Sequence, residues 1–436
     1  MKRNFFFIIT LLISITANSQ ANYYYYDGNK IDLDMNINYV NVLSDTDFDY
    51  NSIPDIQVDT LVTNKTYMWY KIHFININDK VEFYSKRNQL LNNNHIKHIA
   101  YYYGNLNDEP VGTSNIFYVK LKNIQDINEL ENLCGQNNVE LVKQVPYMPF
   151  WFKLKSKTFI TSIELANLFY QYDIIDEIDV GFDIKYTIPI LSSSSNTQTT
   201  PNTSNSSNCV NDTDFNLQWG LENLINPDID INACDAWNIS KGNNVKVAIV
   251  DTGIDTTNSD LVNTEINFYN SFFDQVLTQP YTTYGHHGTM MAGTIGAIQN
   301  NSYKISGVAP ECLMMDVMFS DLPGQNAFPN RGEALAACIS YAWQNEADVI
   351  NCSWGDRAGH LQDIHSPLLI QALNNAATQG RNGRGCVVVF ASGNQYQNIN
   401  YPPINFNKAL CVGGIDINGE RAIWGGGFLN HHLGID

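Results

Sequence analysis

The groups best suited to proton transfer in this sequence are an aspartate and a histidine beside apolar segments. Asp251 closes the apolar run VKVAIVD, and His286 and His287 open the segment HHGTMMAG. A carboxylate at the end of a buried strand has to be paired or hydrogen-bonded. A histidine suits it, because an acid that holds one ring nitrogen leaves the other nitrogen free to accept a proton. The sequence therefore predicts an Asp–His pair with general-base character.

Two other apolar runs also end in polar residues. Ser353 closes the run VINCS, and Asn394 follows the run VVVFASG. In open sheets of parallel strands, ligands bind beyond the carboxyl ends of the strands. We therefore expect Asp251, Ser353 and Asn394 to face one crevice.

The segments that carry these residues alternate between strand and helix patterns. Continuous apolar runs predict strands at VKVAIV, ECLMMDVMF, ADVINCS, CVVVFAS and ALCVGG. Helical spacing of apolar residues between them occurs at Leu335, Cys338, Ile339 and Ala342 and again at Leu369, Ala372, Leu373 and Ala376. This alternation predicts an α/β fold, a doubly wound and mostly parallel sheet covered by helices on both faces.

The first part of the chain has a different character. A basic head, an apolar run and small residues make residues 1–19 typical of a secretory signal peptide. Residues 20–110 are rich in Tyr and Asn, and alternating segments such as KVEFYS predict a β-rich region of unknown role. After the signal peptide we expect no membrane span, because no segment is long and apolar enough.

Residues 111–188 predict a ferredoxin-like βαββαβ domain. The elements are strands at IFYVKL, VELVKQV, WFKLKS and near GFDIKY, with helices at INELENLC and TSIELANLFYQY. The second helix has a capping box, Thr161 and Glu164, and an apolar stripe of Leu165, Leu168 and Phe169. Residues 189–211 are rich in Ser, Thr and Asn and predict an exposed, cleavable linker before a domain at 212–436.

Charge and cysteine content restrict the function further. The formal net charge of -19 would repel phosphates, so we expect no nucleic acid partner.

Of the eight cysteines, Cys209 and Cys234 form the best candidate disulfide. The apolar surroundings of five others predict buried thiols at Cys312, Cys338, Cys352, Cys386 and Cys411. No metal site is predicted from cysteines so scattered.

Several motifs now carry a family resemblance. VAIVDTGID, HGTMMAG, VINCSWG and ASGN, in this order, resemble the aspartate, histidine, substrate-strand and oxyanion motifs of the subtilases, the subtilisin-like serine peptidases. The resemblance implies that Asp251 orients His287, that His287 is the general base and that Asn394 binds the oxyanion. It also implies that a substrate backbone lies along the substrate-binding residues Ser353, Trp354 and Gly355.

The resemblance has departures. Trp354 stands where an aliphatic residue is usual, and Met290 where many members carry a second histidine. The nucleophile of the family lies in a Gly-Thr-Ser motif after the Asn motif, and the sequence stops at GFLNHHLGID before one. The only Gly-Thr-Ser, at residues 112–114, precedes a strand in the wrong region, so Ser114 is not a candidate.

The resulting hypothesis is a secreted or cell-envelope serine endopeptidase precursor, a C-terminally incomplete zymogen. The βαββαβ domain would act in cis as a propeptide, and the substrate would be a protein or peptide. The chemistry requires no cofactor; calcium is a possible structural ion of the family without an identified site.

Two alternatives remain from the sequence. A peptide-binding pseudo-peptidase would keep Ser353 to Gly355 as a binding edge, but it gives no reason to retain Asp251, His287 and Asn394 together. A metallohydrolase using His286, His287 and Asp251 lacks a third ligand motif, and adjacent histidines on a regular element diverge.

Overall fold

The described part of the chain comprises most residues between 22 and 429. The computed structural model describes residues 22–46, 50, 53–63, 67–104, 110–183, 186–187, 209–261, 266–271, 275–277, 286–319, 331–356, 366–392, 406–420, 423–424 and 428–429. The expected signal peptide and residues 189–208 of the expected linker lie outside these ranges.

A seven-stranded sheet forms the centre of the C-terminal half. Its strand order is β15-β14-β16-β13-β17-β19-β20, and every neighbouring pair is parallel except β14 with β15. The strands are β13 Lys246–Asp251, β14 Ile266–Asn270, β15 Gln275–Leu277, β16 Leu313–Met318, β17 Val349–Cys352, β19 Val387–Ala391 and β20 Ala409–Val412. The five apolar runs predicted as strands therefore all lie in this sheet.

Helices cover both faces of the sheet. The helices are α4 Ala233–Ala236, α5 His286–Gly296, α6 Arg331–Gln344 and α7 Pro367–Gly383, with 3-10 turns at Phe215–Leu217 and Pro227–Ile229. On one face Val247 and Ile249 of β13 pack with Ala292 of α5. On the other face Ala248 and Val250 pack with the apolar stripes of α6 and α7. Both predicted helical stripes are fully buried, as expected for a doubly wound fold.

Residues 116–179 form a four-stranded antiparallel sheet with two helices. The order along the chain is β8 Ile116–Leu121, a 3-10 turn at Ile124–Asp126, α2 Ile127–Gln136, β9 Val139–Gln144, β10 Trp151–Ser156, α3 Ser162–Phe169 and β11 Ile175–Asp179, and the strand order is β11-β8-β10-β9. The predicted capping box is present, since Thr161 Oγ1 accepts from the Glu164 N–H and Glu164 accepts from the Thr161 N–H. Leu165 and Phe169 are buried, but Leu168 is exposed, so the apolar stripe of α3 is narrower than predicted.

The last strand of this unit differs from the prediction. It spans Ile175–Asp179, not the expected segment near GFDIKY. Gly181 follows the strand with φ +67°, and a Cβ at this position would lie 2.6 Å from the carbonyl oxygen of Ile116. The chain therefore turns at Gly181, where only glycine fits, and the strand ends before it.

The N-terminal region contains a second antiparallel sheet and a hairpin. The sheet order is β4-β5-β3-β6-β7, with β3 Met35–Ser44, β4 Ile56–Thr63, β5 Met68–Phe74, β6 Ile96–Tyr103 and β7 Val111–Gly112, and the hairpin consists of β1 Tyr23–Tyr26 and β2 Asn29–Asp32. Tyr25 of the hairpin stacks on Tyr170 at 4.6 Å between ring centroids. The apolar core of this region is continuous with that of residues 116–182.

The β prediction for KVEFYS was wrong. These residues begin helix α1, Lys80–Leu91. Asp79 caps the helix by accepting from the N–H groups of Val81 and Glu82, and Phe83 and Leu90, seven residues apart, are buried beneath it. The N-cap and the i, i+7 contacts therefore outweigh the short local alternation. In the described part of the chain, no helix is both long and apolar enough to cross a membrane.

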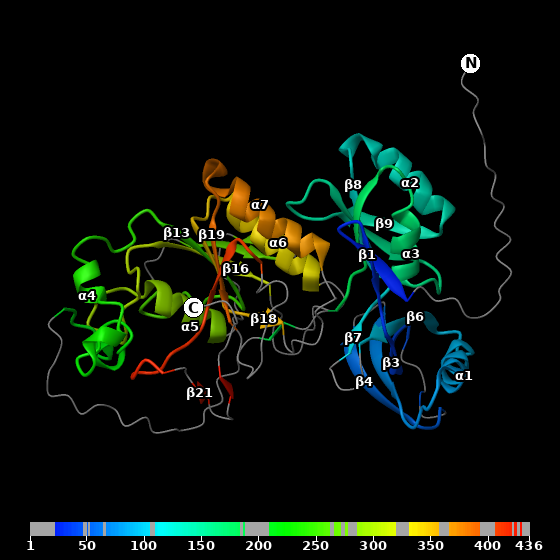
Figure 1. Cartoon of the computed structure of the whole chain (residues 1–436), viewed down its shortest axis with the longest axis horizontal. Helices are drawn as coiled ribbons and strands as arrows, with labels where there is room; N and C mark the ends of the chain where they lie inside the picture. The colour runs from blue at the N-terminus through cyan, green and yellow to red at the C-terminus, as the bar shows by residue number, and fades with distance from the viewer. Residues whose placement is uncertain are drawn as a thin grey trace, which may run out of the picture.

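The unit of residues 116–179 packs against α6 and α7 (Figure 1). Glu333 near the start of α6 accepts hydrogen bonds from Lys153 Nζ at 2.6 Å and from the Tyr118 hydroxyl at 3.2 Å. Asp179 at the end of β11 accepts from Ser366 Oγ at 2.6 Å and from the Leu368 N–H at 3.3 Å, so it sits at the start of α7. Negative charge is favourable at a helix N-terminus.

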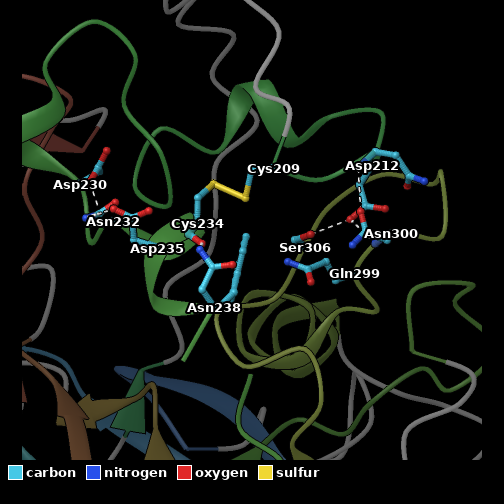
Figure 2. The surroundings of a disulfide bond; sticks show 12 residues. Cys209, Asp212, Asp230, Asn232, Cys234, Asp235, Asn238, Gln299, Asn300 and Ser306 are labelled. Carbon is cyan, nitrogen blue, oxygen red and sulfur yellow. Dashed lines mark hydrogen bonds between the residues drawn. A yellow bond between two sulfur atoms is a disulfide. The ribbon is translucent and has the colours of Figure 1, made fainter. Parts of the chain in front are cut away.

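The segment that enters the C-terminal half is anchored at two points. The predicted Cys209–Cys234 disulfide is present. Asp212, three residues after Cys209, accepts hydrogen bonds from Ser306 Oγ and from the N–H of Asn300. These bonds connect this segment to the loop after α5 (Figure 2). These contacts hold residues 209–212, the end of the expected linker and the start of the following domain, against the fold.

Candidate functional site

Asp251 and His287 meet beyond the carboxyl edge of the central sheet. Asp251 is the last residue of β13, and His287 lies in the first turn of α5. The Nδ1 atom of His287 is 2.9 Å from each carboxylate oxygen of Asp251. The Asp251 side chain is 1% exposed and that of His287 11%. Nδ1 is thus engaged by a buried acceptor, and among the described residues none hydrogen-bonds Nε2.

The turn after β13 fixes both members of this pair. The N–H of Thr252 donates to Asp251 Oδ1 at 2.7 Å, and Thr252 Oγ1 accepts from the N–H of Gly288 at 2.9 Å. A Cβ at position 288 would clash with the carbonyl oxygen of Gly253, so only glycine lets α5 approach the turn this closely.

The two adjacent histidines differ in environment. His287 is half-buried against Asp251, whereas His286, which starts α5, is exposed. The described residues hold no group of three or more His, Cys, Asp or Glu side chains able to bind a metal ion. The geometry around Asp251 is therefore that of an Asp–His pair.

A second acidic residue, Asp316 on β16, lies close to this pair. Its side chain is buried, and its Oδ2 accepts from the N–H of Ile254 at 3.0 Å. Burial raises the pKa of Asp316 to about 7, repulsion from Asp251 adds to the rise, and the Ile254 N–H partly offsets it. Sequence reasoning missed this residue, although an aspartate within the apolar run ECLMMDVMF was a visible signal.

The predicted substrate-binding residues follow β17 at the same edge. Ser353 Oγ accepts from Asn351 Nδ2 at 2.9 Å. The Trp354 side chain is fully buried; its Nε1 donates to the carbonyl of Val250 at 2.8 Å, and its ring packs on Phe319 and Phe390. Trp354 therefore contributes to the core, and only its backbone remains for a ligand.

A short strand lies along this edge. β18, Gly355–Asp356, pairs antiparallel with β12, Tyr186–Thr187, with Thr187 opposite Gly355 and Tyr186 opposite Asp356. β12 precedes residues 188–208, which contain most of the predicted linker. No pattern in the sequence predicted this pairing. Asn394, the predicted oxyanion donor, lies outside the described residues.

Comparison with known families agrees with the site. The model described as "Subtilase family" matches residues 242–426, which include Asp251, His287 and the segment from Ser353 to Gly355. These residues form a subtilase domain. Thermitase from Thermoactinomyces vulgaris is 33% identical over 192 residues, which cover 44% of this chain and 62% of thermitase. Subtilisin DY from Bacillus licheniformis is 35% identical over 187 residues, 42% of this chain and 60% of that protein.

Other relatives extend this comparison. A calcium-dependent protease of Trichormus variabilis is 31% identical over 232 residues, which cover 48% of this chain and 33% of the protease. The chain thus spans less than two thirds of the length of each of these relatives. The crystal structure of fervidolysin from Fervidobacterium pennivorans, a keratinolytic enzyme related to subtilisin, matches with a TM-score of 0.50 and 25% identity over 69% of this chain and 43% of that one. The α/β fold of the subtilase domain agrees with these similarities.

Proposed function

We propose that this subtilase domain hydrolyses peptide bonds by a Ser-His-Asp acyl-enzyme mechanism. The observation that carries the proposal is the buried carboxylate of Asp251 on Nδ1 of His287 at the carboxyl edge of the sheet. Nε2 of His287 takes the proton of the attacking serine and later delivers it to the leaving amine. Asp251 keeps the imidazole in the required tautomer and stabilises the imidazolium. The side-chain amide of Asn394 donates to the oxyanion.

The nucleophilic serine is proposed to come from a later segment of the full-length protein. Ser114 does not qualify, because its side chain is fully buried and accepts from the N–H of Ile116. Apolar side chains of β20 support a further segment. Leu410 is 59% and Val412 55% exposed, whereas strands of parallel sheets are normally covered on both faces.

Residues 111–188 are proposed to be a propeptide that inhibits the domain in cis, with the ferredoxin-like fold expected from the sequence. Three features support this role: the buried contact of Glu333 with Lys153, the position of Asp179 at the start of α7, and the pairing of β12 with β18. β12 occupies the edge along which a substrate would add as an antiparallel strand. The match to fervidolysin over 69% of the chain is longer than the part after residue 208, so it reaches into the preceding region.

The full-length protein is proposed to be exported as a precursor and to be processed between Pro189 and Asp212. Its proposed substrate is a protein or peptide. Because Cys209 is bonded to Cys234, a cut before Cys209 leaves the new N-terminus anchored to the domain. Mass spectrometry of the secreted full-length protein should find an N-terminus between Pro189 and Cys209. A mature chain that starts near residue 20 and still hydrolyses protein would contradict the propeptide role.

No cofactor is proposed for the chemistry, and calcium is proposed only as a structural ion of the full-length protein. The name of the Trichormus relative points to calcium for that protein. In this chain the carboxylate of Asp212 accepts from three donors, the N–H groups of Asn300 and Asn301 and the hydroxyl of Ser306, so we assign no calcium ligand there.

Hydrolysis of labelled casein by the secreted full-length protein tests the function. We expect hydrolysis that a serine-reactive organophosphorus inhibitor abolishes and that His287→Ala lacks. A processed wild-type protein that binds peptides without cleaving them would identify the pseudo-peptidase alternative. Cleavage that survives His287→Ala would overturn the assigned mechanism.

A further inference from the structure

Asp316 is a buried carboxylic acid that has one hydrogen bond to the described residues. It lies on β16, an inner strand of the sheet, opposite Ile249 of β13 and Phe268 of β14. Its Oδ2 accepts from the N–H of Ile254, and its Oδ1 is buried without a hydrogen-bond partner in the described residues. A buried carboxyl group with half of its hydrogen-bonding capacity unused is unfavourable for stability. If position 316 contributed to folding alone, an apolar residue would be expected there.

The hydrogen bond from the N–H of Ile254 to Asp316 holds the turn that follows Asp251. Ile254 is the third residue of this turn, after Thr252 and Gly253, and Gly253 has φ +96°. The left-handed conformation and the absence of a side chain at Gly253 leave this turn few internal restraints. A buried acceptor on the neighbouring strand supplies one from outside the turn.

This turn also holds the helix that carries His287. Thr252 Oγ1 accepts from the N–H of Gly288, and the N–H of Asp255 donates to Thr289 Oγ1 at 2.9 Å. These two hydrogen bonds lie on either side of Ile254 in the turn and reach the two residues that follow His287. A displacement of Ile254 would therefore move the first turn of α5 relative to Asp251.

We propose that Asp316 is a positioning residue for the Asp251–His287 pair. It acts through the N–H of Ile254, which fixes the turn of residues 252–255 and so the distance between Nδ1 of His287 and the carboxylate of Asp251. The inference rests on the proposed function of this pair. It requires an acceptor at position 316 and does not require a negative charge, so an amide can replace the acid.

Proton NMR of the full chain tests the inference without measuring catalysis. An Nδ1–H held by a carboxylate gives a far-downfield proton resonance, which His287→Ala identifies by its loss. Asp316→Asn retains an acceptor for Ile254 and should retain the resonance. Asp316→Leu and the smaller Asp316→Ala remove the acceptor and should lose it. Two apolar variants of different size are used so that a folding defect in one leaves the other informative.

Leu373→Ala is the matched control for general destabilisation. Leu373 is buried in α7 on the opposite face of the sheet, and its truncation should lower thermal stability without changing the resonance. Retention of the wild-type resonance in a folded Asp316→Leu or Asp316→Ala protein would overturn the inference, and so would its loss in Leu373→Ala. Absence of the resonance from the wild-type chain would contradict the Asp251–His287 pair itself, and both the proposed function and this inference would then fail.

Discussion

His287 and Asp251 are 36 positions apart in the sequence, yet Nδ1 of His287 lies 2.9 Å from both carboxylate oxygens of Asp251. The contact joins the end of a buried strand to the start of a helix. Both ends are held by the same turn, through the N–H and the hydroxyl of Thr252. The pair is therefore part of the packing of α5 on β13, and its geometry is set before any substrate binds.

The two neighbouring histidines should differ strongly in their effect on activity. His287→Ala should lower kcat of the processed full-length protein by about 10⁴- to 10⁶-fold, because the serine then lacks its base. His286→Ala should change kcat less than about threefold, because His286 is exposed and its neighbour is the one that contacts Asp251. Steady-state hydrolysis of a peptide substrate measures both. Equal losses in the two variants would contradict the assignment.

Asn394→Leu should reduce kcat by about 10²- to 10³-fold with little change in KM, because the amide donor is needed mainly when charge develops on the carbonyl oxygen. The variant should keep the thermal stability of the wild type to within a few degrees. Peptide hydrolysis together with a melting curve separates the two effects. A rise in KM at unchanged kcat would instead assign Asn394 to ground-state binding.

Lys153→Met should weaken the contact of the unit of residues 116–179 with the subtilase domain. Burial raises the pKa of Glu333, but attraction to Lys153 and Lys143 outweighs burial, so its pKa lies below the ordinary value. Removing Lys153 leaves the buried carboxylate of Glu333 with the hydroxyl of Tyr118 and the ammonium of the more exposed Lys143, which should cost about 3–5 kcal/mol.

The measurement is size-exclusion chromatography after the linker has been cut by an added protease. We expect the two fragments to stay together in the wild type and to separate in Lys153→Met. The control is Lys122→Met, which removes an exposed ion pair with Asp173 in the same unit and should leave the fragments associated. Co-elution in all three proteins would show that the buried pair does not hold the interface.

Asp316→Asn should change how stability depends on pH. The folded-state pKa of Asp316 is about 7, above its ordinary value of 3.8, so between these values the native state holds a proton that the unfolded chain has lost. The unfolding free energy of the wild type should therefore fall as pH rises from about 4 to about 7, by a few kcal/mol from this group alone.

The asparagine variant lacks this titration and should gain stability relative to the wild type over the same range, with no further change above it. Urea unfolding at about pH 5 and about pH 8 measures the difference. A constant difference between the two proteins would mean that Asp316 is ionised throughout.

Replacing both Cys209 and Cys234 by serine should destabilise the segment after the linker. The disulfide closes a loop of 25 residues, for which chain entropy predicts about 3–4 kcal/mol. Melting curves with and without reductant measure the effect. Reductant should lower the melting temperature of the wild type towards that of the variant and leave the variant unchanged; a response of the variant would point to another cause.

The sequence by itself determined the parts of the fold that depend on local patterns. Continuous apolar runs identified β13, β16, β17, β19 and β20, because strands covered on both faces need apolar residues throughout. Helical spacing identified the buried faces of α6 and α7, and Thr161 with Glu164 identified the start of α3. The candidate pair of Asp251 and His287 followed from polar residues beside such runs, in the order of a known family. The strands, the helix faces and the capping box are local features, each visible within a few neighbouring residues, whereas the pair also needed the order of motifs along the chain.

Only the tertiary structure decided the features that depend on contacts between distant residues. KVEFYS became a helix because Asp79 caps it and its apolar side chains reach a core contributed by other strands. The side chain of Trp354 lies in the core because its indole reaches the carbonyl of Val250 on the neighbouring strand. The partners of Asp316 and of Glu333 lie 62 and 180 positions away, at Ile254 and Lys153. A buried polar group is stabilised by whichever partner the fold brings within hydrogen-bonding distance, and no local pattern specifies that partner.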